Sequence, residues 1–158
     1  MKVNPVGKRL SEVERAYIAG FLDADGAIMA TIERHKEKKF GFRIRVVLKA
    51  TQANPKILHW LQNKCHCGLV RKNRTTYDWL LRKQSEIKEL LTILKPYFKI
   101  KNQQTTKALR LLSGTINSPK ELMVAARLAD TLARLNVRSK NRRINHATMI
   151  KDKRSRND

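Results

Sequence analysis

The sequence is poor in cysteine and has no long apolar run. Its two cysteines, Cys65 and Cys67, flank His66, a spacing that rarely forms a good disulfide, and two thiols cannot build a disulfide framework. With His59 nearby they match no common zinc-binding spacing, so their role stays open. No run approaches the roughly 18 apolar residues of a membrane-spanning helix, and acids interrupt the N-terminal apolar segment, unlike a signal peptide. We therefore expect an intracellular chain that is neither secreted nor membrane-bound.

Acidic residues are also scarce. The chain has 13 of them against 35 lysines and arginines, a formal net charge of +22 on 158 residues. Because this excess destabilises a compact chain by self-repulsion, it favours a polyanionic partner, and nucleic acid in particular. We expect neither a membrane surface nor a small-molecule substrate. The length fits a single domain over 1–158, with a basic N-terminal arm over 1–10 and a basic C-terminal loop or tail over 138–158.

Capping and turn residues predict five helices. Ser11 and Glu14 form a capping box at the start of the first helix, and Gly26 ends it. Asn54-Pro55, Ser85 and Ser118-Pro119 are start signals for three others. The predicted helical segments are 12–25, 55–64, 85–94, 102–113 and 119–133.

Four strands are predicted between the helices, at 27–32, 42–50, 69–74 and 77–82. Alternate residues from Phe42 to Ala50 are apolar, whereas Arg43, Arg45 and Lys49 lie between them, so this strand is half-buried with a basic open face. The order αββαββα, followed by further helices, predicts an α+β domain with an exposed antiparallel sheet. A two-stranded ribbon of this kind fits the major groove of B-DNA.

The first predicted helix is unusual because residues 16–22 (AYIAGFL) are apolar nearly all round, which indicates burial on several sides. Ala16, Gly20 and Ala24 recur at four-residue spacing, and such a stripe lets another backbone approach closely. We therefore predict a homodimer through this helix. Asp23 and Asp25 end the helix at the negative pole of its dipole, which costs about 0.3–1 kcal/mol for each acid and which a cation would offset.

The two acids cannot share one task. Residues two apart on a helix differ in direction by about 200°, so if Asp23 or Asp25 faces a metal ion, the other is structural. The alternative is that both are solvated acids before a turn. Since the segment occurs once per chain, a reaction on both strands of a duplex would need two chains related by a two-fold axis.

Residues 17–26, YIAGFLDADG, closely resemble the motif of the LAGLIDADG homing endonucleases. The single motif, the length and the order of elements resemble the homodimeric, chloroplast intron-encoded branch of that family, over roughly residues 11–136. The resemblance implies a site-specific endonuclease that cuts both strands of a long pseudo-palindromic DNA duplex with Mg²⁺ or Mn²⁺ and leaves 3′ overhangs. It also implies an intracellular setting, with chloroplast and mitochondrion as candidate compartments. The alternatives are an RNA-binding intron maturase and a non-catalytic DNA-binding regulator of the same fold.

The resemblance also assigns roles within the site. It implies that Asp25 is a metal ligand, that the backbone carbonyl of Ala24 faces the same metal, and that Gln52 orders the attacking water. Lys56, which stands where a relative has arginine, would position solvent, and Lys101 would stabilise the phosphate charge. Taken one at a time, Gln52, Lys56 and Lys101 could equally be ordinary surface residues.

The residues expected to read the DNA lie on the strands. They are Thr31, Glu33, Arg43, Arg45, Lys49, Arg71, Asn73 and Asp78. The acids Glu33 and Asp78 would accept a hydrogen bond from cytosine or hold a neighbouring arginine, with a surface salt bridge as the alternative. Arg138, Lys140 and Arg142 would touch phosphates and so provide affinity without sequence specificity.

Overall fold

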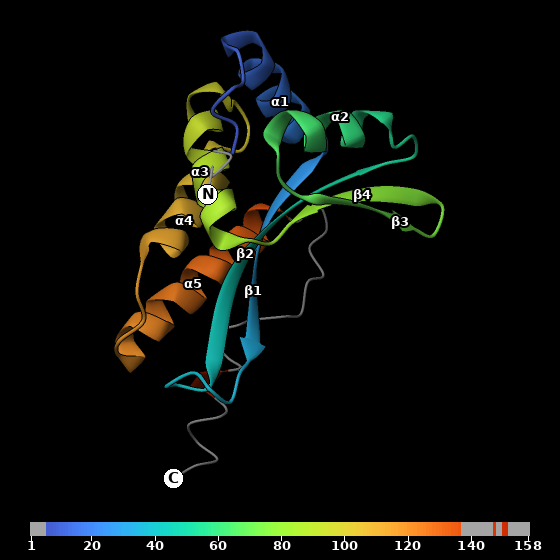
Figure 1. The fold of residues 1–158 in the computed structure, drawn as a ribbon. Coiled ribbons are helices and arrows are strands. Elements are labelled where there is room, and N and C mark those ends of the chain that lie inside the picture. Colours follow the sequence, from blue (N-terminus) through green and yellow to red (C-terminus); the bar gives the residue numbers. More distant parts are fainter. Residues whose placement is uncertain (1–5, 137–146, 148–149, 152–158) are drawn as a thin grey trace, which may run out of the picture.

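The fold is α+β, as predicted, and the computed structural model describes residues 6–136 together with 147, 150 and 151 (Figure 1). The elements in chain order are α1 (Glu12–Asp25), β1 (Gly26–Arg34), β2 (Phe42–Gln52), α2 (Lys56–Cys65), β3 (Leu69–Asn73), β4 (Thr76–Leu81), α3 (Gln84–Leu94), the 3₁₀ turn η1 (Lys95–Tyr97), α4 (Asn102–Ser113) and α5 (Pro119–Leu135). None of the helices within these described ranges is both long and apolar enough to cross a membrane.

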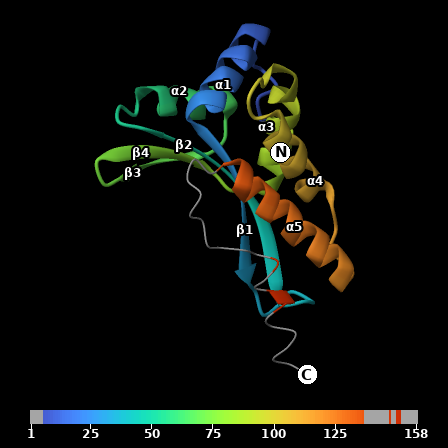
Figure 2. The same ribbon diagram turned by 180° about the vertical axis from the view of Figure 1, so that it is seen from behind.

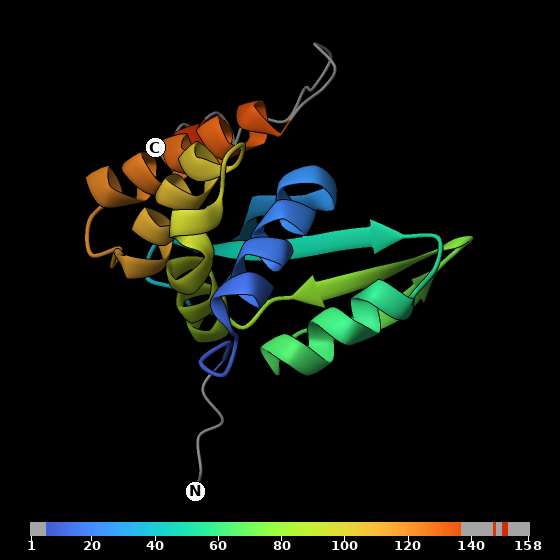
Figure 3. The same ribbon diagram turned by 90° about the horizontal axis from the view of Figure 1, so that it is seen from above.

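One antiparallel sheet forms the centre of the molecule, with the strand order β1-β2-β4-β3. The helices pack against one face of it, and the tips of the two hairpins point in different directions, so the sheet is bent between them (Figures 1 and 3). The view from behind shows α5 lying beside β1 (Figure 2). No helix of the described residues covers the other face of the sheet, which forms the predicted saddle.

The alternation of side chains along each strand explains this division. On β1 and β2 the residues turned towards the helices are buried and apolar, including Ile28, Ala30, Val46 and Leu48. These side chains, with those of the helices, form one continuous core. The residues between them point to the open face, because successive strand residues alternate sides.

The second hairpin is fixed by Trp79, which is completely buried and donates through Nε1 to the carbonyl of Cys67 at 3.1 Å. Gly68 lies directly against this ring: a Cβ atom on it would be 2.2 Å from Nε1, and its φ of +83° favours glycine. Both cysteines are buried and free. A hydrogen bond to Cys65, together with burial, holds the pKa of the Cys67 thiol far above its usual value, so the pair acts as core side chains.

Four expectations need correction. Helix α3 begins at Gln84 with Lys83 as its N-cap, so Ser85 lies inside the helix and does not cap it. The turn of the second hairpin is residues 74–75, one position earlier than expected, and Arg74 adopts a φ of +54° there. Residues 6–10 are not an arm, because Val6 and Leu10 are buried in the core. In the C-terminal segment, the described residue Ile150 is buried beside β2 and α5, so at this position the chain packs on the domain and is not a free tail.

Candidate functional site

Helix α1 runs into strand β1 without a connecting loop. Gly26 is both the C-cap of the helix and the first residue of the strand. A Cβ atom at this position would lie 2.7 Å from the carbonyl oxygen of Leu22, so only glycine fits the close approach. The junction holds Asp25 at the exposed tip of α1, on the edge between the helix layer and the sheet.

Asp23 is bonded within the fold and points away from Asp25, which agrees with the prediction from helical geometry that the two acids face different directions. Its side chain is buried, with 7% of the residue exposed. The carboxylate accepts backbone N–H groups from Lys99 at 2.8 Å, from Ile100 at 3.3 Å and from Lys101 at 2.9 Å. It therefore ties the end of α1 to the segment that leads into α4, and this is the contact that places Lys101.

Asp25 points elsewhere and is exposed. Gln52, the last residue of β2, donates through Nε2 to Oδ2 of Asp25 at 2.8 Å. The ammonium group of Lys101 donates to the backbone carbonyl of Asp23, on the neighbouring turn of the same helix end. Gln52 and Lys101, which are 27 and 76 positions from Asp25 in the sequence, thus lie at the same helix end. They bring together a carboxylate, a carboxamide and a cation.

A hollow of about 670 Å³ lies beside this cluster. Asp25, Ala24 and Lys101 line it from the end of α1 and the start of α4, and Gln104 and Asn136 add polar groups from α4 and the end of α5. Asp23 also lines it, but its carboxylate is occupied by backbone N–H groups, so the Asp25 carboxylate, the Lys101 cation and the two amides are the groups that can accommodate a phosphate and water. Lys56 is not among the lining residues of the described chain: it begins α2, is exposed, and its backbone N–H is held by Asn54 at 3.0 Å.

The donors at the tip of α1 fit a hard divalent cation. No group of three or more histidine, cysteine or acidic side chains that could hold a metal is found in the described part of the chain. The described residues of one chain therefore do not supply a complete set of side-chain metal ligands. Mg²⁺ needs few protein ligands because it keeps several waters, so the Asp25 carboxylate with the Ala24 carbonyl is a sufficient set if a second copy adds another carboxylate. No basic residue of α1 itself occupies its last turn, and the positive charge at this negative pole of the dipole comes from Lys101, which donates to the Asp23 carbonyl.

The open face of the sheet carries the predicted DNA contacts in two groups. At the first hairpin, Glu33 and Arg43 are directly paired across the strands and form an ion pair of 2.8 Å. The hydrogen bond from Arg43 holds the pKa of Glu33 below its usual value. Thr31 lies opposite Arg45 on the same face, and Arg45 donates to the carbonyl of Arg82 at 3.2 Å.

The second group is organised by Asp78, whose side chain is fully buried beneath cations. It accepts hydrogen bonds from the Thr51 hydroxyl at 2.6 Å and from Asn73 at 2.9 Å. Lys49 lies 3.1 Å and Arg71 3.9 Å from its carboxylate. Burial raises the pKa of Asp78, but the Thr51 and Lys49 hydrogen bonds and the Lys49 charge outweigh it, and the pKa ends below its usual value.

Of the two roles considered for Asp78, direct acceptance from a base is incompatible with this burial, whereas holding a neighbouring cation agrees with it. Glu33 likewise holds an arginine. The remaining predicted phosphate contacts, Arg138, Lys140 and Arg142, lie outside the described residues.

The face of α1 that bears the small residues is open. Ala16, Gly20 and Ala24 are all exposed, and a Cβ atom added at Gly20 would meet nothing within 4 Å. Along the same helix Val13 is 79% and Tyr17 55% exposed. These two residues also line a hollow of about 430 Å³ that continues onto α2.

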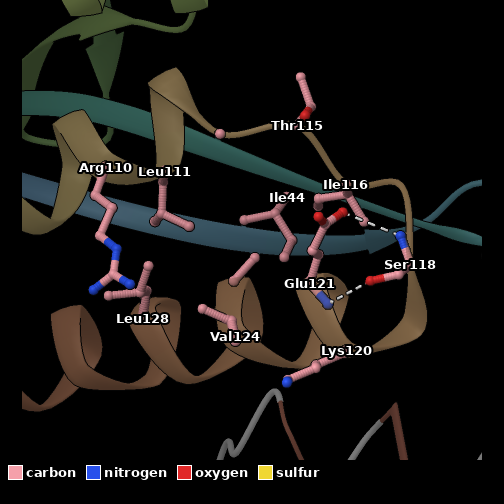
Figure 4. A pocket seen from close by; sticks show the side chains of 12 residues that line it. Ile44, Arg110, Leu111, Thr115, Ile116, Ser118, Lys120, Glu121, Val124 and Leu128 are labelled. Carbon is pink, nitrogen blue, oxygen red and sulfur yellow. Dashed lines mark hydrogen bonds between the residues drawn. The ribbon is translucent and has the colours of Figure 1, made fainter.

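A further hollow, of about 500 Å³, lies between β2, the end of α4 and the start of α5 (Figure 4). Its single acid, Glu121, is engaged in the capping box of α5 with Ser118, at 3.1 Å in both directions. Arg110 and Lys120 stand at its edges, and its remaining walls are mostly apolar. It contains no carboxylate and amide pair like that at Asp25, so it is not a candidate for the same chemistry.

Comparison with known proteins places these observations in context. A family described as "LAGLIDADG endonuclease" matches residues 18–116. The chain is 29% identical over 125 residues to the DNA endonuclease I-CreI of Chlamydomonas reinhardtii, covering 76% of this chain and 77% of that protein. It is 32% identical over 129 residues to the DNA endonuclease I-CvuI of Chlorella vulgaris, covering 78% and 80%. The crystal structure of I-CvuI in complex with the I-CreI target superposes with a TM-score of 0.78 at 30% identity, over 90% of this chain and 94% of that one.

Proposed function

The chain belongs to the LAGLIDADG endonuclease family, and from that premise we propose that it is a site-specific homing endonuclease that hydrolyses both strands of a long, pseudo-palindromic DNA duplex and leaves 3′ overhangs. The observation that carries this proposal is the cluster at the tip of α1. There the exposed Asp25 is held by Gln52 and lies beside Lys101, next to the basic open face of the sheet. A protein that only bound DNA would have no need of this arrangement.

Each residue of the cluster has a defined task in phosphodiester hydrolysis. Lys101 supplies positive charge beside the hollow, where it would stabilise the negative charge that develops on the phosphate. Gln52 fixes the orientation of Asp25 and offers its amide oxygen to a water. Lys56 would hold solvent from the start of α2. Asp25 and the Ala24 carbonyl would hold the cation.

The cation is proposed to be Mg²⁺, with Mn²⁺ as a substitute. Bound there, it would lower the pKa of a coordinated water and neutralise charge on the phosphate. Related I-CvuI complexes with DNA were obtained with Mg or with Ca, which supports a divalent cation in general. Oxygen donors suit several divalent cations, and the small number of protein donors supports Mg²⁺ in particular, because Mg²⁺ keeps several waters.

The functional unit is proposed to be a homodimer. Two copies of α1 would pack along Ala16, Gly20 and Ala24, whose exposure leaves room for close backbone contact. A two-fold axis there would place the two Asp25 carboxylates side by side, one for each strand. It would also present two basic sheet faces to one continuous duplex, which agrees with a pseudo-palindromic target. Intron homing in a chloroplast or mitochondrion remains the setting that we propose for this activity.

Selection of cleaved duplexes from a randomised DNA library, with Mg²⁺ present, tests the proposal directly. We expect recovery of one long site with two-fold sequence symmetry, no cleavage when the cation is removed by chelation, and no cleavage by Asp25→Asn although that variant still binds. Specific binding of intron RNA with no cut duplex would favour a maturase. Specific DNA binding by wild type without cleavage under any cation would favour a regulator.

A further inference from the structure

Gln104 is a polar side chain that the proposed mechanism leaves unused. It lies in the first turn of α4, three residues beyond Lys101, and it lines the hollow that also contains Asp25. Only 7% of the residue is exposed. Its carboxamide makes no hydrogen bond with any residue in the described ranges of the chain.

Neither amide atom of Gln104 is among the fully buried, unpartnered side-chain atoms of the described residues, so the carboxamide is accessible to water from the hollow. The group has two N–H donors and two acceptor lone pairs, and buried polar side chains almost always have partners because their desolvation is otherwise uncompensated. The adjacent residue, Gln103, is exposed and therefore satisfied by water. Gln104 offers the same amide at the hollow, so a molecule that enters the hollow can replace water as its partner.

Because the hollow combines the proposed metal ligand with a cation, the molecule that it would receive is the scissile phosphate. We propose that Gln104 is a further catalytic residue, which donates a hydrogen bond from Nε2 to a non-bridging oxygen of that phosphate. Donors aimed at a phosphoryl oxygen stabilise charge as it develops, and they cost no reorganisation when they are already in place. This inference rests on the proposed endonuclease function.

Two variants of matched chemistry test the role. Gln104→Met removes the amide while keeping the length and volume of the side chain, and Gln103→Met makes the same change at the exposed neighbour. For the free protein we expect Gln104→Met to melt at the wild-type temperature or up to about 3 °C higher, because no internal hydrogen bond is lost. A clear fall in Tm would show that the side chain is bonded within the fold and would overturn the proposal.

Cleavage is measured in single turnover on the duplex selected with the wild type. We expect Gln104→Met to lower the cleavage rate by about ten- to a hundred-fold, the range for losing one hydrogen bond to a charged group. Its Kd for that duplex should change by less than about three-fold. Gln103→Met should cleave at the wild-type rate. Gln104→Glu should be at least as slow as Gln104→Met, because it places a second carboxylate against the phosphate; full activity of Gln104→Glu would overturn the donor role.

The outcomes also separate this inference from the function on which it rests. A wild-type chain that cuts no duplex would overturn both. A Gln104→Met chain that cuts at the wild-type rate would overturn the role of Gln104 alone and leave the endonuclease function standing.

Discussion

Replacing Asp23 and Asp25 separately by asparagine should have opposite effects on stability and activity. The two oxygens of the Asp23 carboxylate share three backbone donors: Oδ2 accepts from the N–H of Lys99, and Oδ1 accepts from those of Ile100 and Lys101. Asparagine keeps one oxygen and replaces the other with an NH₂ group, so one backbone donor would face another donor. Losing this hydrogen bond to a charged group and leaving a donor unpaired costs about 2 kcal/mol.

In a domain of this size that loss lowers Tm by about 4–8 °C. Asp23→Ala removes both acceptor oxygens and with them all three hydrogen bonds, which should cost about 3 kcal/mol of unfolding free energy. The cost is smaller than that of three buried unpaired donors, because Lys99 and Ile100 lie at the surface, where water reaches their N–H groups. Asp25→Asn should change stability by less than about 0.5 kcal/mol, since Asp25 is exposed and asparagine can still accept from Gln52.

The assay is thermal unfolding followed by circular dichroism, at one protein concentration for every variant because dimerisation makes Tm depend on concentration. Cleavage of the selected duplex is measured alongside, below the lowest Tm. Asp25→Asn should be inactive and fully stable, whereas Asp23→Asn should be less stable and keep part of its activity. If Asp25→Asn proved the less stable of the two, or if Asp23→Asn melted like the wild type, the division of tasks between the two acids would be refuted.

Three further changes test other parts of the molecule. Gly20→Leu should leave the protomer folded and more stable by up to about 1 kcal/mol, because an exposed helical glycine is replaced. The variant should nevertheless sediment as a monomer and not cleave DNA, and a dimeric variant would show that α1 is not the interface. Gly26→Ala, whose Cβ would lie 2.7 Å from the Leu22 carbonyl, should cost about 2 kcal/mol from overpacking and lower Tm by about 4–8 °C, and an unchanged Tm would contradict the tight junction. The pKa of Asp78 is lower in the folded state than in the unfolded chain. The ionised carboxylate therefore stabilises the fold above about pH 4, and this stabilisation is lost as the pH falls through the folded-state pKa. Asp78→Asn should flatten the acid side of the curve of unfolding free energy against pH, measured by urea unfolding.

Most elements could be predicted because their signals are local. The capping box at Ser11 and the Ser118-Pro119 start signal begin the helices that they predicted, and the structure adds a capping box at Ser118. The first two strands are longer than expected, since β1 extends to Arg34 and β2 to Gln52. These polar ends have weak intrinsic preference and are strands only because the partner strand pairs with them, which no single segment reveals.

Only part of the site could be predicted, because its remaining contacts join segments that are far apart in the sequence. Helical periodicity separated Asp23 from Asp25, but it could not show that Asp23 binds the amides of residues 99–101, because that contact spans 76 to 78 positions. The burial of Asp78 depends on the pairing of β4 with both β2 and β3. Gln104 gave no signal at all in the sequence, where it is one of two adjacent glutamines; only its burial next to Lys101 distinguishes it from Gln103.

The absence of a loop between α1 and β1 has a consequence for where the duplex is cut. Asp25 and the first residue of the reading strand are consecutive, so the cleavage centre cannot shift relative to the open face. From Ala27 to Glu33 the open face of β1 advances by six residues, about 20 Å at about 3.3 Å for each strand residue, which matches roughly six base pairs at about 3.4 Å each. Since the proposed two-fold axis at α1 would double this span, we expect a duplex of fewer than about twelve base pairs to be too short to reach the Glu33–Arg43 pair of both copies.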